Sequence, residues 1–438
     1  MTTALEYDWF VGMDWGSATH DAHVTDAAGA CIATHTVEHT SAGLARWVEW
    51  LAALSAGHLG RVAVAIEVPR GAVVELLLER GVAVFSLNPK QLDRFRDRFS
   101  VAGAKDDRLD ARVLASALRT DRARFRALTI DAPSVIQIRE LTRAEAVLAE
   151  EFAALTNRLR ALVHRLVPEW LTLSANADDA WFWDVLELAA TPALGQRVRR
   201  ATVDRVLQTH RIRRVTTADV QRVLAAAPLR VAPGTVEAVT HHIALLLPRV
   251  RLVHAQRHAC ARDLTTALDA LATSDDPGPS DEASAGGAPP PPSDVAILCS
   301  VPGVGTAVTA TFIAEASGLL AARNHAVLRL VTGVAPVRRQ TGKNKRGTVG
   351  MRYACNARLR VACYHWARVS TRVDAAARRY YAALRARGQT HGRALRSVAD
   401  RWLRILLAML TARTLYDPTR FPPPPAGEGP LAPTVCPS

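Results

Sequence analysis

The sequence predicts an α/β domain at the N-terminus and a largely α-helical remainder. Short β-rich apolar runs alternate with helical spacing between Trp9 and Leu87. After Pro133 the apolar residues fall on alternating three- and four-residue steps, which is typical of packed helices. A length of 438 residues suits two or three domains of ordinary size.

The N-terminal elements are expected in the order β-β-β-α-β-α-β, followed by a helix. A three-strand meander comes first, with glycines between its strands. Gly81 suits the end of the second helix, because glycine adopts the left-handed conformation found after many helices. This order is the ribonuclease-H-like plan. The expected strands are 9–14, 22–25, 31–37, 61–67 and 82–87, and the expected helices are 42–56 and 73–80.

The middle of the chain predicts a coiled-coil region. A second helical arm, roughly residues 236–271, can pack antiparallel against the first, and Pro248 should kink it. The seam is equally consistent with an intramolecular pair of arms or with a homo-oligomer. Its residues are Ile138, Leu141, Leu148, Phe152, Leu155, Leu159, Leu162 and Leu166.

Composition changes mark the boundaries of the remaining segments. Residues 273–294 are rich in Pro, Ser, Gly and Asp, so a disordered linker is expected there. The resulting division is an N-terminal α/β domain over 1–130, a coiled-coil region over 134–272 with a helical insert at 171–233, the linker, a C-terminal domain over 295–416, and a disordered tail over 417–438.

The positive charge of the chain is concentrated near its C-terminus. The net charge is +14, yet residues 323–413 alone carry +19, from 21 Lys and Arg against two acidic residues. Such a block neutralises phosphates and supplies sequence-independent affinity for nucleic acid. No apolar run is long enough to span a bilayer, no secretion signal is visible, and the six cysteines form no CxxC pair. These features favour a cytoplasmic protein that binds DNA and no membrane.

Four carboxylates are candidate metal ligands. Asp14 and Glu67 each end an apolar strand, and Asp107 and Asp110 lie three residues apart at an expected helix start. Carboxylates gathered on neighbouring elements repel one another unless a cation neutralises them, and Mg²⁺ prefers such oxygen ligands. Each residue also has a simpler explanation, as a turn former or as a charge matched to the helix dipole. Spacing does not exclude Asp106, which shares a helical face with Asp110.

The C-terminal domain contains two motifs that suit nucleic-acid contact. Gly303 and Gly305 lie between two expected helices, where a glycine hairpin can either expose N–H groups to a phosphate or form a tight turn. Thr341 follows in a Gly- and base-rich loop, before a basic helix expected from residue 352 to residue 360. The basic residues around it that we expect to bind nucleic acid are Arg338, Arg339, Lys343, Lys345, Arg346 and Arg352.

Together these residues resemble the DEDD transposases of insertion sequence family one-ten, which are relatives of the Piv invertases. The resemblance covers about two-thirds of the chain, and its two unrelated motif sets occur in the family's order. They are Asp14, Glu67 and Lys105-x-Asp107-x-x-Asp110-Ala111 in the first half, and Val301-Pro-Gly-Val-Gly, Gly333-x-x-Pro336 and Gln340-Thr-Gly342 in the second.

The resemblance implies a DNA transposase or site-specific recombinase with a RuvC-like N-terminal domain and a C-terminal transposase domain whose start resembles a helix-hairpin-helix. It implies Mg²⁺ or Mn²⁺ at the four carboxylates, a nucleophilic serine supplied by another subunit of a dimer or tetramer, and a bridge RNA encoded by the element. It also implies a bacterial, nucleoid-associated protein.

The sequence departs from the family at the nucleophile. Thr341 occupies the position of the serine, and its β-methyl group restricts χ1 beside the hydroxyl. We favour Thr341 as a working nucleophile. Two alternatives stay open: a RuvC-like structure-specific endonuclease, which would not need the loop around Thr341, and an inactive DNA-binding descendant of a transposase.

Overall fold

The computed structural model describes residues 7–99, 107–274, 291–341 and 344–420, with the backbone alone over 338–349. The chain divides into two compact units, residues 1–132 and residues 133–438. The linker expected at 273–294 lies mostly outside the described residues, and so does most of the tail expected after residue 416.

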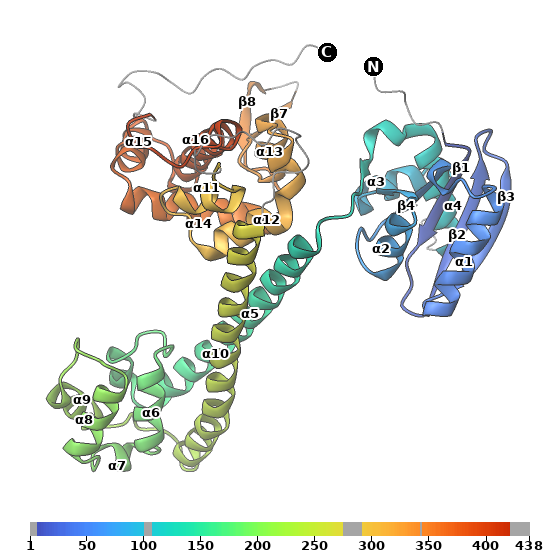
Figure 1. The fold of residues 1–438 in the computed structure, drawn as a ribbon. Coiled ribbons are helices and arrows are strands. Elements are labelled where there is room, and N and C mark those ends of the chain that lie inside the picture. The colour runs from blue at the N-terminus through green and yellow to red at the C-terminus, as the bar shows by residue number, and fades with distance from the viewer. Residues whose placement is uncertain (1–6, 100–106, 275–290, 342–343, 421–438) are drawn as a thin grey trace. The chain divides into compact units, whose positions relative to one another are not determined.

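The first unit contains a six-stranded mixed sheet with the order β3-β2-β1-β4-β5-β6 (Figure 1). Strands β1, β2 and β3 form an antiparallel meander, whereas β1, β4 and β5 run parallel. The expected order of elements is therefore confirmed from the first strand to the fifth. The strands are β1 (Trp9–Asp14), β2 (Thr19–Asp26), β3 (Cys31–Glu38), β4 (Val62–Ile66), β5 (Ala83–Ser86) and β6 (Arg126–Ala127).

Helices cover both faces of this sheet. Helices α1 (Ser41–Leu54) and α2 (Ala72–Glu79) pack on the face that carries Val11 and Met13. Helices α3 (Pro89–Arg96) and α4 (Asp107–Asp121) pack on the face that carries Phe10 and Ala65. Helix α3 was not predicted from the sequence, because four of its eight residues are charged, which weakens the apolar pattern around the buried Leu92. Short 3-10 turns, η1 (Leu59–Arg61) and η2 (Arg122–Arg124), precede β4 and β6.

Two long helices, α5 (Pro133–Leu166) and α10 (Thr235–Ser274), lie side by side in the second unit (Figure 1). Two contacts show that their pairing is antiparallel. Cys260 of α10 contacts the carbonyl of Leu141 in α5, whereas the earlier His254 of α10 contacts the later Phe152 of α5. Pro248 lies within α10, which continues through it as one helix.

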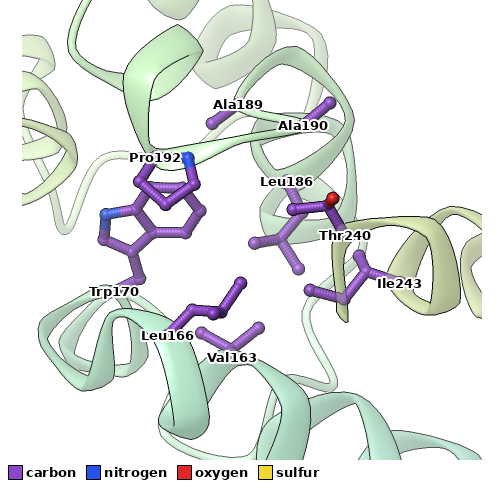
Figure 2. A pocket seen from close by; sticks show the side chains of 9 residues that line it. All are labelled: Val163, Leu166, Trp170, Leu186, Ala189, Ala190, Pro192, Thr240 and Ile243. Carbon is purple, nitrogen blue, oxygen red and sulfur yellow. The ribbon is translucent and has the colours of Figure 1, made fainter. Parts of the chain in front are cut away.

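A helical insert connects the two arms. Its core is built on the buried aromatic rings of Trp170, Trp181 and Trp183. Figure 2 shows a small hollow where Trp170 faces Leu186 and Ile243, and apart from Thr240 its lining is apolar. The insert contains η3 (Pro168–Thr172), α6 (Ala180–Leu188), α7 (Pro192–Gly195), α8 (Arg200–Thr209) and α9 (Thr217–Leu224).

The C-terminal part is helical around one β-hairpin. Trp366 of α14 and Trp402 of α16 stack with ring centroids 6.0 Å apart, and Phe312 of α12 meets Trp366 edge-on. The elements are α11 (Asp294–Ser300), α12 (Thr306–Ala321), α13 (His325–Val331), β7 (Val337–Thr341), β8 (Asn344–Gly350), α14 (Ala357–Val373), α15 (Ala375–Ala386) and α16 (His391–Ala412). No described helix combines the length and apolarity needed to cross a bilayer.

Two expectations for this region were wrong. The segment around Thr341 is a two-stranded antiparallel hairpin where a loop was expected, and its basic composition hid the strands. The basic helix begins at Ala357 rather than at Arg352, because the Asn356 side chain accepts hydrogen bonds from the N–H groups of Arg358 and Leu359.

Candidate active-site edge

Asp14 and Glu67 lie at the same edge of the sheet. Asp14 is the last residue of β1, and Glu67 directly follows β4. These strands are parallel neighbours in which Met13 is opposite Ile66. Asp14 follows Met13 and Glu67 follows Ile66, so the two acids lie next to each other at the strand ends. The sequence analysis assigned both residues to strand ends, and the register brings those ends together.

Helix α4 begins at this edge. Its last turns lie at the other end of β1, where Arg119 reaches the carbonyl of Ala27 in the turn between β2 and β3. Arg122, just beyond the helix, covers the ring of Tyr7 immediately before β1. The helix therefore runs antiparallel to β1, and its N-terminal residues approach the edge that carries Asp14.

Gly12 permits this close approach of helix and strand. A Cβ atom at residue 12 would lie 1.9 Å from the carbonyl oxygen of Ala111 and 2.4 Å from the backbone nitrogen of Ala115. Asp14 is two residues farther along β1, so strand alternation puts it on the face covered by α4. The spacing Gly12-x-Asp14 thus serves both the packing and the site.

Asp107 and Asp110 have very different surroundings on α4. Asp107 is exposed in the first turn of the helix, whereas Asp110 is only 2% exposed. Arg96 of α3 forms a bidentate ion pair with Asp110: Nε lies 2.7 Å from one carboxylate oxygen, and Nη2 lies 2.8 Å from the other. Asp110 is therefore bound by a residue that was not predicted from the sequence, because helix α3 was not predicted.

This ion pair corrects one part of the sequence reasoning. The sequence puts all four carboxylates at strand ends or a helix start, positions that usually face solvent and tolerate truncation. Asp110 is instead buried, and its removal would leave Arg96 with Asp93 as its remaining carboxylate partner. Lys105 and Asp106 lie outside the described residues.

The donor atoms at this edge suit a hard divalent cation. All four candidate ligands are carboxylates, the ligand type that Mg²⁺ and Mn²⁺ take. Among the described residues, however, no three His, Cys, Asp or Glu side chains lie close enough together to hold a metal ion. The bidentate Arg96 pair accounts for Asp110, since its two oxygens face a guanidinium. The set fits the ion in chemistry, provided that Arg96 releases Asp110.

A further carboxylate lies across the strand pair from Asp14. Asp21 of β2 is the antiparallel partner of Asp14, and the hydroxyl of Thr36 donates a hydrogen bond of 2.9 Å to Asp21. Directly opposite residues of like charge are destabilising. Asp21 was not predicted from the sequence as a neighbour of Asp14. The antiparallel register of β1 and β2 would have indicated that the two residues are paired.

The two glycines of the α11–α12 turn play different structural roles. Gly303 has φ = +83°, and a Cβ atom there would lie 2.7 Å from the backbone nitrogen of Ser370. The carbonyl of Pro302, next to it, accepts a hydrogen bond from the indole of Trp366. Gly305 caps α12 and has open space around it. Gly303 is thus a packed turn residue, whereas Gly305 leaves a helix N-terminus accessible.

Thr341 is the last residue of β7, opposite Asn344 of β8. Lys343, one of the expected basic contacts, lies outside the described residues, and so does Gly342. Arg338 and Arg339 are in β7, Lys345 and Arg346 are in β8, and their backbones alone are described. Arg352 is half-buried beyond the hairpin. The hairpin therefore brings the hydroxyl residue and most of the expected phosphate-binding residues into one element.

Comparison with known proteins identifies the family. A family model for DEDD transposases of IS110 matches residues 11–168, which include all four candidate carboxylates. A second model, described as the transposase IS116/IS110/IS902 family, matches residues 295–382, which include Thr341. The chain belongs to this family of insertion-sequence transposases. The resemblance drawn from the two motif sets is thereby confirmed.

Two of three similar proteins carry a transposase designation, and the third is an insertion-element protein. A Sinorhizobium fredii protein with the transposase designation y4uE is 44% identical over 50% of this chain and 61% of its own length. The mini-circle transposase designated for IS117 of Streptomyces coelicolor is 28% identical over 94% of this chain and 96% of its own. The 43.6 kDa protein of insertion element IS110 from the same species is 27% identical over the same shares.

Proposed function

We propose that this transposase cuts and exchanges DNA strands with two separate groups of residues. The first is the carboxylate edge of residues 1–132, and the second is the hydroxyl of Thr341. The observation that carries the proposal is the convergence of three elements at one sheet edge: the ends of β1 and β4 and the start of α4. Acids drawn from three elements to one edge are typical of a metal-dependent phosphodiester site.

Asp14, Glu67, Asp107 and Asp110 would hold Mg²⁺ or Mn²⁺. When bound, the ion supplies positive charge that stabilises the phosphate oxygens during strand cleavage. The contribution of the chain is to position the four carboxylates and to balance their charge. In this structure Arg96 already balances Asp110, so it would have to turn away for Asp110 to act as a ligand.

Thr341 would act as the covalent nucleophile. Its hydroxyl oxygen bonds to phosphorus while the bond from phosphorus to one deoxyribose oxygen breaks, and the hydroxyl proton ends on the leaving oxygen. A strand hydroxyl can then reverse the step and join to the same phosphate. The position of Thr341 at the end of β7, beside the hairpin connection, supports this role because side chains near a hairpin tip are within reach of a ligand.

Basic residues of the C-terminal part would bind the DNA backbone. The charge of +19 between residues 323 and 413 supports a polyanion partner, since each neutralised phosphate releases counterions. The family resemblance further supports an element-encoded bridge RNA as a guide and a homo-oligomer in which one subunit completes the site of another. The exposed face of the α5–α10 pair is available for such assembly.

A covalent-adduct assay tests this function. The full chain is incubated with nicked, junction and linear DNA in Mg²⁺, with and without RNA transcribed from the element's flanks, and protein–DNA adducts are scored on denaturing gels. We expect adducts from the parent chain and from Thr341→Ser, whose smaller side chain frees χ1, but none from Thr341→Ala. Thr348→Ala, a neighbouring threonine change in β8, serves as the matched control.

Each alternative function gives a different result. Cleavage without any adduct, unaffected by Thr341→Ala, would show a metal-dependent endonuclease. DNA binding without cleavage or adduct would show an inactive descendant. Asp14→Ala and Glu67→Ala should abolish cleavage and retain DNA affinity. If Asp107→Ala and Asp110→Ala both still cleave, the carboxylate site is disproved, and if Asp106→Ala alone is inactive, the acidic motif lies one residue earlier.

A further inference from the structure

An exposed tryptophan follows directly after Asp14. The side chain of Trp15 is 42% exposed, although tryptophan is among the residues that gain most from burial. It comes immediately after the last residue of β1, so it lies at the same sheet edge as the candidate carboxylates. Isolated exposed apolar residues are common on protein surfaces, so exposure alone assigns no role to Trp15.

The backbone beside Trp15 is held by two hydrogen-bonded histidines, of which His20 is buried and His39 is exposed. His20, which is fully buried, accepts a hydrogen bond of 3.3 Å at Nδ1 from the N–H of Gly16. Because Nδ1 is an acceptor, the ring proton is on Nε2, which lies 2.8 Å from Nδ1 of His39. The buried His20 ring, hydrogen-bonded on both sides, favours one conformation for the chain that leaves Asp14.

The same histidine restrains the indole. The rings of Trp15 and His20 are 6.2 Å apart at an interplanar angle of 37°. One side of Trp15 therefore meets a fixed ring, and much of the rest is open to solvent. A preorganised aromatic side chain loses little conformational entropy when another planar group stacks on it.

An aromatic–cation pair lies just after α3. Phe99 is 37% exposed, and the guanidinium of Arg112 lies 5.4 Å from its ring centroid. Arg112 is itself exposed and two residues after Asp110. Exposed aromatic rings combined with exposed cations are the surface that binds single-stranded nucleic acid, because bases stack on the rings and phosphates meet the cations.

We propose that Trp15 is a base-stacking residue that receives an unpaired base next to the phosphate to be cut, with His20 and His39 positioning it. The proposal rests on the function proposed above, since it places a DNA strand at the carboxylate edge. Stacking on an aromatic ring is tolerant of base identity. Trp15 would therefore select an unstacked, single-stranded conformation rather than a particular sequence.

The test compares two DNA strands that differ only in their bases. One probe is oligothymidylate, and the other is a strand of equal length with an abasic nucleotide at every position, which keeps all the phosphates. Binding to the full chain is measured in Ca²⁺, a cation that oxygen ligands hold. We expect Trp15→Ala to weaken oligothymidylate binding about tenfold, Trp15→Phe to weaken it less, and neither change to affect the abasic strand.

Fluorescence gives a second readout. Oligothymidylate should quench a part of the tryptophan emission that is missing in Trp15→Phe. Ile32→Ala is the matched control, because Ile32 is 46% exposed in the same unit but lies in β3 near the opposite end of the sheet. Equal losses on both strands, or no loss from Trp15→Ala, would disprove stacking at Trp15 and leave the proposed function intact. Failure of the parent chain to bind oligothymidylate would contradict both.

Discussion

The partly buried Arg96 and the buried Asp110 form a bidentate ion pair, in which Nε and Nη2 of the guanidinium lie 2.7 and 2.8 Å from the two carboxylate oxygens. The hydrogen bond that Arg96 donates to Asp110 is the main reason that the pKa of Arg96 is raised above its ordinary value. Asp93, on the surface, binds a third nitrogen of the same guanidinium. Arg96 of α3 thus neutralises the negative charge of Asp110, as a bound metal cation would otherwise do.

The first prediction is that Arg96→Ala destabilises the first unit strongly. Removing one partner of a buried ion pair leaves the other charge uncompensated, which costs about 3–5 kcal/mol. Because the Arg96 side chain is itself 21% exposed, we expect a loss towards the lower end of this range. Mg²⁺ should recover part of this loss if Asp110 is a metal ligand, because the ion replaces the lost positive charge. Thermal unfolding midpoints of parent and variant, each in EDTA and in Mg²⁺, measure both effects.

Arg46→Ala is the control for this comparison. Arg46 pairs with Glu38 at 3.1 Å, but both side chains are more than half exposed. Exposed pairs contribute about 0–1 kcal/mol, so this variant should melt close to the parent with either treatment. An Arg96→Ala midpoint that is low in EDTA and unchanged by Mg²⁺ would indicate that Asp110 has a structural role alone.

The second prediction separates Gly303 from Gly305. Gly303→Ala should destabilise the C-terminal part, because the new Cβ would lie 2.7 Å from the nitrogen of Ser370 on a backbone with φ = +83°. We expect a loss of about 2 kcal/mol or more. Gly305→Ala meets no neighbouring atom and should fold normally. If Gly305 approaches a DNA phosphate, its variant should lose DNA affinity at an unchanged melting midpoint.

The third prediction concerns the basic hairpin. Arg338→Ala, Arg339→Ala and Arg346→Ala should each weaken DNA binding across sequences. The slope of log K against log salt should fall by about 1 for each phosphate that the variant no longer neutralises. Arg378→Ala is the control, because its guanidinium donates hydrogen bonds to the carbonyls of Thr371 and Arg372 and so closes the end of α14. A salt slope that is unchanged by the hairpin variants and reduced by Arg378→Ala would contradict this assignment.

Much of the first unit could be predicted because its elements are short and strongly patterned. The strand Trp9–Asp14 is a continuous buried run, and Glu67 directly follows an entirely buried one. Both acids were therefore assigned to strand ends from the sequence. The two strand ends are adjacent because β1 and β4 pair in parallel. This pairing joins residues far apart in the chain, so no local sequence pattern indicates it.

The features that were missed depend on tertiary contacts or on unusual composition. Arg96 lies in a short polar helix, and its significance arises only from its contact with Asp110 on α4. The β7–β8 hairpin is rich in basic residues and glycine, which weaken the usual strand signal. Gly303 and Gly305 look alike in sequence, and they are distinguished by the left-handed backbone of Gly303 and its packing against Ser370.

The last prediction concerns the pH dependence of the fold around His20. Burial, reinforced by the nearby charge of His39, lowers the pKa of His20 below its ordinary value of 6.5. In the unfolded chain His20 takes up a proton as the pH falls below about 6.5, whereas in the folded chain it stays neutral until a lower pH. The unfolded state therefore binds more protons in this range, so the stability contributed by neutral His20 is complete above pH 6.5 and is lost as the pH falls towards the lowered pKa.

His20→Gln should reduce this acid sensitivity. Glutamine can still accept the hydrogen bond from Gly16 and donate one to His39, but it does not titrate. The unfolding midpoint of the variant should fall less than that of the parent between about pH 7.5 and about pH 5.5. His58→Gln, at an exposed site in the same unit, controls for the loss of a histidine as such. A parent and a His20→Gln variant with equal pH slopes would show that the proton on His20 has no influence on folding in this range.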